Sequence, residues 1–367
     1  MTAKQFLARQ DFKSLLQALK AEAYSIIAPQ VRDNAIVYEK IENISQLPRG
    51  ILDIQAPGSY KLENEESERW FAWANGPQAL KPLLFSPEEV LWSAELQDNK
   101  LAFKECAPDD KSVAVIGVRA CDLAALDLQD KHFLQKEYSD AHYQKRRENI
   151  LLIAVNCSHP ADTCFCVSTG DGPFVSAGYD IVLTELEEGF LINPGSDKGS
   201  NICDQLPLCE ATDQQTQQSF QQLENAINRQ QRKLPNANLA KLLPDQLEHK
   251  QWDDIALRCL SCGNCTAVCP SCFCHSELDE QTLDGLSTQH IRQWDSCFNL
   301  DHSYIHGITI RAESKTRYRQ WLTHKFAYWV EQYGRSGCVG CGRCITWCPV
   351  GIDVVQELKT IAGEANE

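Results

Sequence analysis

The chain has 367 residues, of which 43% are hydrophobic and 23% are charged. This composition is typical of a globular protein, and the length allows two domains with ordinary cores, so a disordered chain is excluded. The formal net charge of −15 at pH 7 disfavours nucleic acid as a partner, because an acidic surface repels phosphate groups.

The N-terminal segment 1–30 carries acidic and polar side chains throughout, and it predicts an amphipathic helix at Gln5–Lys20. It lacks the continuous apolar stretch of a signal peptide. No apolar run in the chain approaches the roughly 20 residues that cross a bilayer. We therefore expect a cytoplasmic protein without a membrane partner.

Strand and helix patterns alternate up to residue 210. The apolar strands "VAVIGV" and "ILLIAV" are each followed by a turn, and a helical segment separates them. This order favours an α/β layer with some parallel pairing. A further strand is expected at 35–41, and a hairpin is expected at 180–199. We predict an α/β (α+β) N-terminal domain over residues 1–210.

The composition changes near residue 211. Residues 211–250 are rich in glutamine and poor in core-forming side chains, which predicts a connecting helix and a proline-containing linker. From residue 251 the periodicity is helical, and "RYRQWLTHKFAYWVEQYG" predicts an amphipathic helix that ends at Gly334. We predict a separate C-terminal domain over residues 251–367.

Two cysteine runs share the spacing C-x2-C-x2-C-x3-C-P, "CLSCGNCTAVCP" at 259–270 and "CVGCGRCITWCP" at 338–349. In two-cluster ferredoxins, three cysteines of such a run bind one cubane cluster and the fourth binds the other cluster. We therefore expect two [4Fe–4S] clusters. One is held by Cys259, Cys262, Cys265 and Cys348, and the other by Cys338, Cys341, Cys344 and Cys269.

Zinc is the alternative for a lone C-x2-C pair, but the third cysteine and the closing Cys-Pro of each run favour iron–sulfur clusters. We expect Gly263, Gly340 and Gly342 to let the backbone pass close to the inorganic sulfide. The segment between Pro270 and Cys338 is long and has a largely helical pattern. This pattern predicts an α-helical ferredoxin domain rather than a compact β-rich one.

Four more cysteines follow the two buried strands, in "GVRACDL" and "NCSHPADTCFC". Both turns leave a sheet at the ends of neighbouring strands, so their thiols can converge on a third [4Fe–4S] cluster, with Arg119 offsetting its charge. Buried structural thiols or a redox disulfide are the alternatives. These four candidate ligands are Cys121, Cys157, Cys164 and Cys166.

The remaining cysteines have less regular spacing. Cys272, Cys274 and Cys297 either pack as small apolar side chains or bind another metal, with His275 or His302 as further ligands. Three others are taken as structural. These are Cys106, Cys203 and Cys209. The basic residues of "SKTRYRQWLTHKF" form a solvated helix face, or they face the clusters or an acidic partner.

Dinucleotide and phosphate-binding motifs are absent from the sequence, and no second C-x-x-C pair flanks Arg119 as a nickel–iron site requires. No histidine or carboxylate pattern has catalytic spacing, so we expect no catalytic residue. Electrons must then come from other proteins and go to other proteins.

Five motifs occur in an order known from one family: "GVRACDLAAL", "CSHPADTCFCVSTGDGP", "CLSCGNCTAVCPSCFC", "WDSC" and "CVGCGRCITWCPVGID". With these motifs, residues 60–356 resemble the beta subunit of soluble sulfhydrogenase-type nickel–iron hydrogenases. The A subunit of anaerobic sulfite reductase is similar in layout.

The resemblance implies a non-catalytic electron-transfer subunit of a cytoplasmic complex. Its partners would be a flavoprotein subunit that binds NAD(P)H and the small and large hydrogenase subunits. A sirohaem subunit would replace the hydrogenase in the sulfite reductase alternative. A third hypothesis, of a different class, is that the cysteines bind zinc and the chain is an interaction scaffold.

Overall fold

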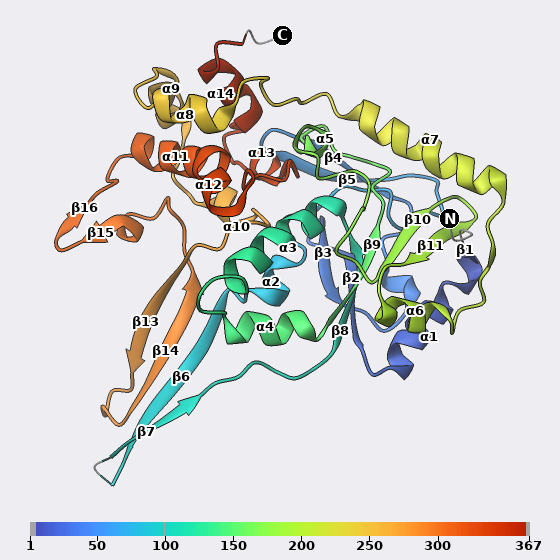
Figure 1. The fold of residues 1–367 in the computed structure, drawn as a ribbon, viewed down its shortest axis with the longest axis horizontal. Coiled ribbons are helices and arrows are strands. Elements are labelled where there is room, and N and C mark those ends of the chain that lie inside the picture. Colours follow the sequence, from blue (N-terminus) through green and yellow to red (C-terminus); the bar gives the residue numbers. More distant parts are fainter. Residues whose placement is uncertain (1–4, 99, 365–367) are drawn as a thin grey trace.

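The computed structural model describes residues 5–98 and 100–364. Within these residues, the largest sheet has eight strands in the order β12-β1-β11-β10-β9-β8-β2-β3 (Figure 1). The strands β2, β8, β9 and β10 are parallel, and the outer strands pair antiparallel. The bounds are Cys209–Glu210 (β12), Gln5–Ala8 (β1), Gly189–Pro194 (β11), Ile181–Glu185 (β10), Ile150–Val155 (β9), Val113–Val118 (β8), Ser25–Arg32 (β2) and Ala35–Lys40 (β3).

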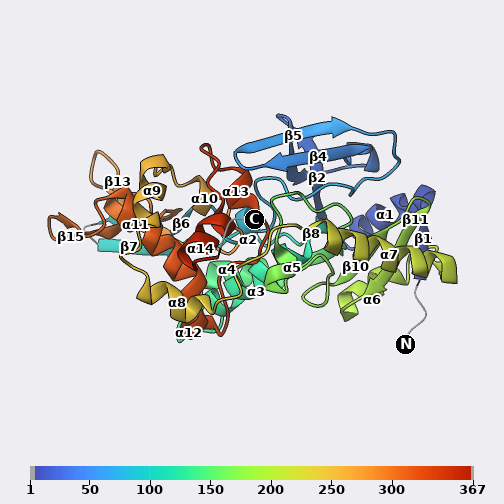
Figure 2. The same ribbon diagram turned by 90° about the horizontal axis from the view of Figure 1, so that it is seen from above.

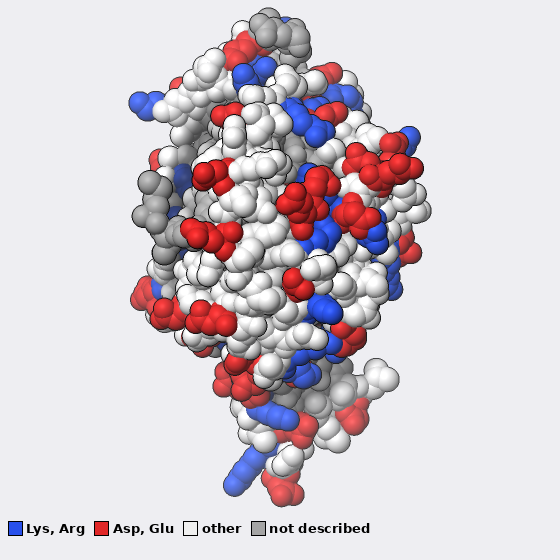
Figure 3. All heavy atoms as spheres, turned by 90° about the vertical axis from the view of Figure 1, so that its right-hand side faces the viewer, with Lys and Arg blue, Asp and Glu red and all other residues white. Residues whose placement is uncertain are grey.

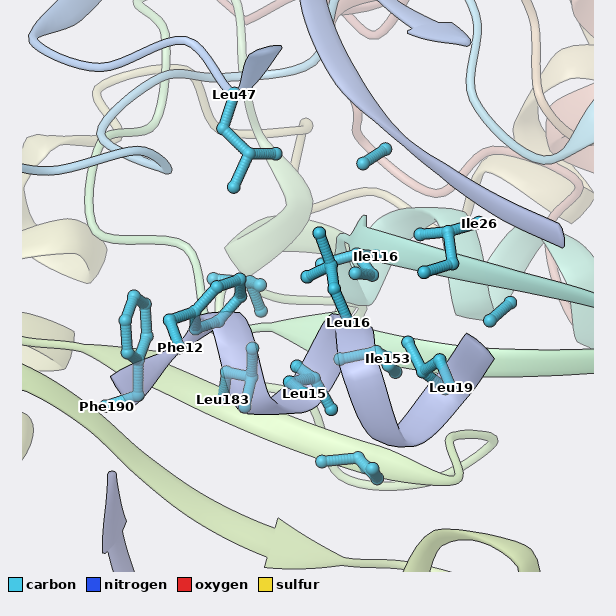
Figure 4. Packing of buried hydrophobic residues seen from close by; sticks show 14 of the residues in the cluster. Phe12, Leu15, Leu16, Leu19, Ile26, Leu47, Ile116, Ile153, Leu183 and Phe190 are labelled. Atoms are coloured by element: carbon cyan, nitrogen blue, oxygen red, sulfur yellow. The ribbon is translucent and has the colours of Figure 1, made fainter. Parts of the chain in front are cut away.

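The central strands are apolar along their length because helices cover both faces of this sheet. On β9, Leu151 and Ile153 belong to the core on one face, and Ile150 and Leu152 belong to the core on the other. Figure 4 shows the side chains of α1 directed at the first of these cores. That face is covered by α1 (Lys13–Ala21) and α6 (Asp197–Cys203), and the other by α2 (Lys81–Leu84), α3 (Ala120–Phe133) and α4 (Ala141–Glu148).

The mixed α/β architecture of the N-terminal region, its parallel pairing and the hairpin of β10 and β11 are confirmed. The prediction of a helix at Gln5–Lys20 is wrong for its first residues. Gln5–Ala8 pair with β11 instead, and Phe6 and Leu7 are buried there, so the helix begins only at Lys13. A strand of four residues is too short for a pattern of alternation to reveal it.

A second sheet joins distant parts of the chain in the order β13-β14-β6-β7. β6 and β7 come from the N-terminal region, whereas β13 and β14 lie between the two cysteine runs, and the long hairpins extend away from the body (Figure 1). Arg292 on β14 forms an ion pair with Glu89 on β6 at 2.5 Å. The bounds are Glu88–Gln97 (β6), Lys100–Glu105 (β7), His275–Gln281 (β13) and Ser287–Trp294 (β14).

The prediction of an α-helical ferredoxin domain is therefore wrong for the segment that follows the first cysteine run. This segment forms β13, β14 and the short pair β15 (Tyr304–Ile305) and β16 (Ile308–Thr309) before helix resumes. Since β13 is mostly exposed and both strands are largely polar, no clear apolar alternation marked them. β14 pairs with β6, far away in sequence, and β13 pairs with β14, and this pairing holds both as strands. The domain boundaries at 210 and 250 stay a prediction.

Two elements pack on the second cysteine run. The hairpin of β4 (Ile51–Ala56) and β5 (Ser59–Asn64) lies beside α13 (Arg343–Thr346) (Figure 2). The Gly58 N–H donates to the carbonyl oxygen of Ile345 at 3.1 Å, and the rings of Tyr60 and Trp347 stack with centroids 5.0 Å apart. The run is thus held by residues from the N-terminal region.

Short helices surround both runs. The helix predicted to end at Gly334 does end there, with Gly334 in the left-handed conformation, but a π turn at His324–Tyr328 divides it. The bounds of the helices are Cys166–Thr169 (α5), Asp213–Arg229 (α7), Leu239–Asp245 (α8), Gln251–Arg258 (α9), Asn264–Ala267 (α10), Ser314–Thr323 (α11), Trp329–Tyr333 (α12) and Val354–Ile361 (α14). Three 3-10 turns complete the described elements, at Arg9–Asp11, Ile44–Gln46 and Asp301–Ser303.

The surface carries mixed charge. On the face drawn in Figure 3, acidic and basic side chains are interspersed with uncharged ones rather than gathered into a single patch. Among residues 5–98 and 100–364, no helix has the length and apolar character needed to cross a bilayer.

Candidate iron–sulfur centres

One hollow is lined by five thiols that come from both cysteine runs. Four of them are the thiols that the spacing assigns to one cluster, and we call these the first thiol set: Cys259, Cys262, Cys265 and Cys348. The fifth is Cys344. Cys262 is exposed, whereas burial raises the pKa of the Cys265 thiol well above its usual value, and the neighbouring thiols raise it further. The set therefore extends from the surface into the interior, and it contains the four thiols that the spacing predicted for one cluster.

The local backbone shapes this set. Cys259 follows the end of α9, and Gly263, with φ of 76°, directs the chain into α10. Two backbone N–H groups donate to thiol sulfurs: Ser261 N–H to Cys259 Sγ and Ile352 N–H to Cys348 Sγ, both at 3.4 Å. Such bonds stabilise thiolates that are bound to iron.

A second group of thiols lies deeper. We call it the second thiol set: Cys269, Cys338, Cys341 and Cys344. The pKa of Cys338 is raised to about 12, mainly by burial and in addition by the nearby thiols of Cys341 and Cys269. The pKa of Cys344 is also raised, first by burial and then by the other three thiols. The other three thiols of the set are thus all near enough to Cys344 to disfavour its thiolate.

The donor chemistry of both sets fits iron–sulfur clusters. Several thiols buried together are hard to ionise, because burial and mutual repulsion both favour the neutral form. Bound iron supplies the positive charge that lets thiolates persist there. Each set offers four sulfurs, three from one run and the fourth from the other, which is the donor set of a [4Fe–4S] cluster.

Lys325 is a buried cation beside the second thiol set. Its ammonium group donates to Cys269 Sγ at 3.4 Å, to Ser271 Oγ at 3.0 Å and to the carbonyl oxygen of Gly337 at 3.4 Å. The π turn at His324–Tyr328 contains this lysine, and such turns are frequent at functional sites. Of the alternatives for this basic stretch, Lys325 therefore faces a thiol set.

The other basic residues of the same stretch have partners within the chain. Lys315 pairs with Asp253 at 2.8 Å, and Arg319 pairs with Glu248 at 3.3 Å. These ion pairs are at least partly exposed, so they contribute little to stability. The stretch as a whole is thus not one functional surface.

A buried ion pair lies between the second thiol set and α3. Arg343 Nη1 is 2.8 Å from Asp122 Oδ1, and both side chains are at most 1% exposed. Arg343 Nε also donates to the carbonyl oxygen of Gly76 at 2.9 Å. The Arg343 guanidinium counteracts the rise in the pKa of Cys341 that burial causes. A fixed positive charge beside a thiol favours the thiolate that iron requires.

The thiols expected to hold a third cluster form the N-terminal thiol set: Cys121, Cys157, Cys164 and Cys166. Cys121 lies in the first turn of α3, Cys157 follows β9, and the other two precede and begin α5. After burial, the thiols of Cys166 and Cys157 are the largest causes that raise the pKa of Cys164. Asn75 donates to Cys121 Sγ at 3.2 Å, and Gln230 donates to Cys166 Sγ at 3.3 Å.

Arg119 lies near this set but is engaged elsewhere. Its guanidinium donates to the carbonyl oxygens of Phe71 at 2.9 Å and Trp73 at 2.7 Å, and it stacks on the Trp73 ring at 4.4 Å. It still counteracts the rise in the pKa of Cys157 that burial causes. Its main structural role is to hold the segment that contains Phe71 and Trp73 against the turn after β8.

The N-terminal thiol set is in contact with the second cysteine run through two glycines. A Cβ atom at Gly340 would lie 2.6 Å from the backbone of Cys166, and one at Gly342 would lie 2.5 Å from the carbonyl oxygen of Thr163. Both glycines have positive φ, at 64° and 75°. The sequence predicted that these glycines let the backbone pass close to inorganic sulfide. In the structure, they let it pass close to the backbone of Thr163 and Cys166.

Replacing Gly340 by alanine is expected to lower the free energy of unfolding by roughly 3–4 kcal/mol, because a left-handed backbone and a backbone clash combine. Gly334→Ala is the matched control: its φ is 75°, but no atom lies within 4 Å of the added methyl group. The control should lose only about 1–2 kcal/mol. Anaerobic urea unfolding measures both, and equal losses would contradict the contact.

Sequence reasoning missed Lys81, Arg343 and Asp122 and left Lys325 undecided. The signals were weak: Asp122 follows a candidate cysteine, and Arg343 lies inside the second run, but charged residues at such places are usually exposed. Only tertiary packing shows that all four are buried. Among the histidine, cysteine and acidic side chains that the structure describes, no three are placed to hold a single metal ion.

Comparisons with known proteins agree with this geometry. A family model described as a 4Fe-4S dicluster domain matches residues 258–352, which span both cysteine runs. Sulfhydrogenase 2 subunit beta of Pyrococcus furiosus is 30% identical to the chain over 286 residues, which cover 77% of this chain and 82% of that protein. No solved structure matches the chain.

Fold, thiol sets and family model together define an iron–sulfur protein of the 4Fe-4S dicluster class, whose part in an oxidoreductase is electron transfer. Within that class, the chain belongs to the family of sulfhydrogenase beta subunits. The predicted resemblance to this family is confirmed.

Proposed function

We propose that the chain relays electrons through two [4Fe–4S] clusters, one on the first thiol set and one on the second. The proposed partners are a flavoprotein subunit that binds NAD(P)H and the small and large subunits of a nickel–iron hydrogenase, in a cytoplasmic complex. The observation that carries the proposal is that thiols from both runs line one hollow and that Cys269 of the first run lies near Cys344 of the second. The name of the relative, a sulfhydrogenase subunit, supports the hydrogenase partner.

The chemistry of the bound clusters would be the uptake and release of single electrons. The chain itself supplies the sulfur ligands, the N–H donors to those sulfurs and the apolar side chains that exclude water. Its buried cations, Lys325 and Arg343, offset negative charge at the second thiol set. No step in this role requires a proton donor or a nucleophile from the chain.

The first thiol set is the proposed contact point with a redox partner. Cys262 is exposed, and two apolar side chains that line the same hollow are also exposed, Leu260 at 64% and Val350 at 40%. A partner that covers these side chains would bring its own redox centre close to this set. The second thiol set is the more deeply buried one, which suits an internal relay.

We also propose that the N-terminal thiol set holds a third [4Fe–4S] cluster. The contacts of Gly340 and Gly342 with the loop before α5 support this proposal, because they join the set to the second cysteine run. The mutual effects of Cys157, Cys164 and Cys166 on their pKa values support it as well. The cluster would extend the relay toward α3 and the parallel sheet.

Replacing Lys325 by methionine is expected to lower the midpoint potential of the cluster on the second thiol set by on the order of 100 mV. Reduction adds negative charge, which the buried ammonium beside Cys269 stabilises, so its loss makes reduction harder. A redox titration followed by paramagnetic resonance measures the shift. Lys325→Arg keeps the charge and should shift less, and equal potentials in all three proteins would refute this role.

Anaerobic purification from the native host, with iron and nickel analysis and identification of the copurifying chains, tests the proposed complex. The proposal predicts a nickel-containing partner and a flavoprotein in the same fraction. A sirohaem subunit in place of nickel would contradict the hydrogenase assignment and support the anaerobic sulfite reductase alternative. A colourless protein that contains zinc would support the scaffold alternative and contradict both.

A further inference from the structure

Two aromatic side chains beside the first thiol set have polar hydrogens without an acceptor. The Tyr318 hydroxyl oxygen and the Trp321 Nε1 are buried, and neither has a hydrogen-bond partner among the residues that the structure describes. The two residues are only 3% and 5% exposed. Both line the hollow that holds the thiols of the first set.

Helix α11 explains why these two side chains share one hollow. Tyr318 and Trp321 are three residues apart, which places them on the same face of the helix. The first residue of the helix is tied to the first cysteine run, because Ser314 Oγ and Ser261 Oγ are hydrogen-bonded at 2.8 Å. About one turn after this contact, the two rings reach the hollow of the first thiol set.

A third ring holds these two in place. Phe298 also lines the hollow, and it is 1% exposed. Its ring centroid lies 6.0 Å from that of Tyr318 and 5.9 Å from that of Trp321, and the Tyr318 and Trp321 centroids are 5.3 Å apart. Because all three rings are buried against one another, neither polar group can turn out to solvent.

A buried hydroxyl or indole N–H without an acceptor lowers stability, and native proteins rarely leave one unpaired. Water is a poor acceptor in this hollow, because an ordered water needs about two to four polar partners of its own. Asn264 Nδ2, in the lining, already donates to the carbonyl oxygen of Trp347 at 3.2 Å. Apart from Asn264, Gly263 and the thiols, the rest of the lining is apolar: Leu260, Phe298, Pro349, Val350, Ile352 and Val354.

The proposed cluster on the first thiol set supplies the acceptors that these two donors lack. Its thiolate and sulfide sulfurs carry negative charge, and hydrogen bonds to such sulfurs are among the factors that set the reduction potential of a cluster. Reduction adds one electron and increases that negative charge. A fixed O–H or N–H donor therefore favours the reduced state over the oxidised one.

We propose that the Tyr318 hydroxyl and the Trp321 indole N–H donate hydrogen bonds to sulfur atoms of the cluster on the first thiol set. The inference rests on the proposed electron-relay function and names two side chains that set the potential of one cluster. Each proton stays on its own oxygen or nitrogen while the cluster gains or loses an electron. The second thiol set has the Lys325 ammonium as its side-chain donor, so the chain sets the two potentials separately.

Tyr318→Phe removes only the hydroxyl, and Trp321→Phe removes the indole N–H. In the anaerobically purified full chain, each should lower the midpoint potential of the signal that Cys348→Ser removes. At a fixed potential the ratio of reduced to oxidised cluster should fall by about tenfold, which is about 59 mV for one electron. A redox titration followed by paramagnetic resonance measures this shift. Unchanged potentials in both variants would overturn the proposal.

Tyr143→Phe is the matched control, because it removes a buried hydroxyl that has a partner elsewhere. Tyr143 lies on α4, its hydroxyl donates to Asp130 Oδ1 at 2.7 Å, and it does not line the hollow of the first thiol set. The control should keep the midpoint potentials of the unaltered chain. An equal fall in the control would overturn the proposal, since the shift would then not depend on a donor in the hollow.

A spectroscopic signature covers the case in which Trp321→Phe fails to fold. Phenylalanine at position 318 keeps the ring that packs on Phe298, so Tyr318→Phe decides that case. Electron–nuclear double resonance of the reduced chain should show a proton coupling that disappears in D2O and is absent from Tyr318→Phe. Identical spectra of the two proteins would overturn the proposal. An unaltered chain without iron would instead refute the proposed function itself.

Discussion

The Cys341→Ser variant is expected to lose one cluster, about four irons per chain, and with it the flux of electrons through the complex. Cys341 belongs to the second thiol set, where its thiol is buried beside Cys269 and beside the Arg343 guanidinium. Serine offers a harder oxygen ligand that binds cluster iron poorly. The measurement is the spin count of the reduced chain by paramagnetic resonance, together with iron analysis.

Cys106→Ser serves as the matched control for this variant, because Cys106 directly follows β7, is only half-buried and belongs to none of the thiol sets. The control should keep its full iron content and spin count. Cys348→Ser separates the two sets: it should remove the signal of the other cluster, because Cys348 lines the hollow of the first thiol set. A Cys341→Ser chain with a full spin count would contradict the assignment of ligands.

Replacing Arg343 by methionine is expected to lower the free energy of unfolding by about 3–5 kcal/mol, because Asp122 is then left as an uncompensated buried charge. The two side chains are 2.8 Å apart and at most 1% exposed. The double variant Arg343→Met with Asp122→Leu removes both charges, so it should recover most of the loss. Anaerobic urea unfolding of the single and double variants measures the coupling.

An exposed ion pair on the same helix provides the comparison for this prediction. Lys131 and Asp127 are 2.8 Å apart on α3, with side chains 32% and 54% exposed. Lys131→Met should change the free energy of unfolding by no more than about 0.5 kcal/mol. If Arg343→Met were equally mild, the pair would not be the fixed charge that we place beside the second thiol set.

The sequence was sufficient to predict those features of the fold and the site that depend on residues close together in the chain. The strands β8 and β9 are apolar at nearly every position, which required cover on both faces of a parallel sheet. The spacing of each cysteine run fixed which thiols can meet around one cluster. The glycine at position 334 marked the end of its helix correctly.

What the sequence did not reveal depends on contacts between distant segments. β13 and β14 are largely polar, and they are strands because β14 pairs with β6 and β13 pairs with β14. The first residues of the chain are a strand because β11 offers them a partner. In both cases the hydrogen bonds that decide the conformation come from residues that no local pattern connects.

The buried cations are the clearest example at the site itself. Lys325 belongs to a basic stretch that is typical of a solvated helix, yet it lies in the π turn at His324–Tyr328 and its ammonium group donates to Cys269 Sγ. Lys81 begins a helix of four residues far from both runs, yet its side chain is buried near Cys269. The charge that surrounds a cluster could therefore not be read from the cysteine pattern.

Iron and acid-labile sulfide per chain, determined on oxygen-free material together with the absorbance near 400 nm, test the central claim most directly. Two cross-ligated cubanes predict a brown protein with at least about eight irons and eight sulfides. A colourless chain, or one with clearly fewer than eight irons after careful anaerobic reconstitution, would contradict the account.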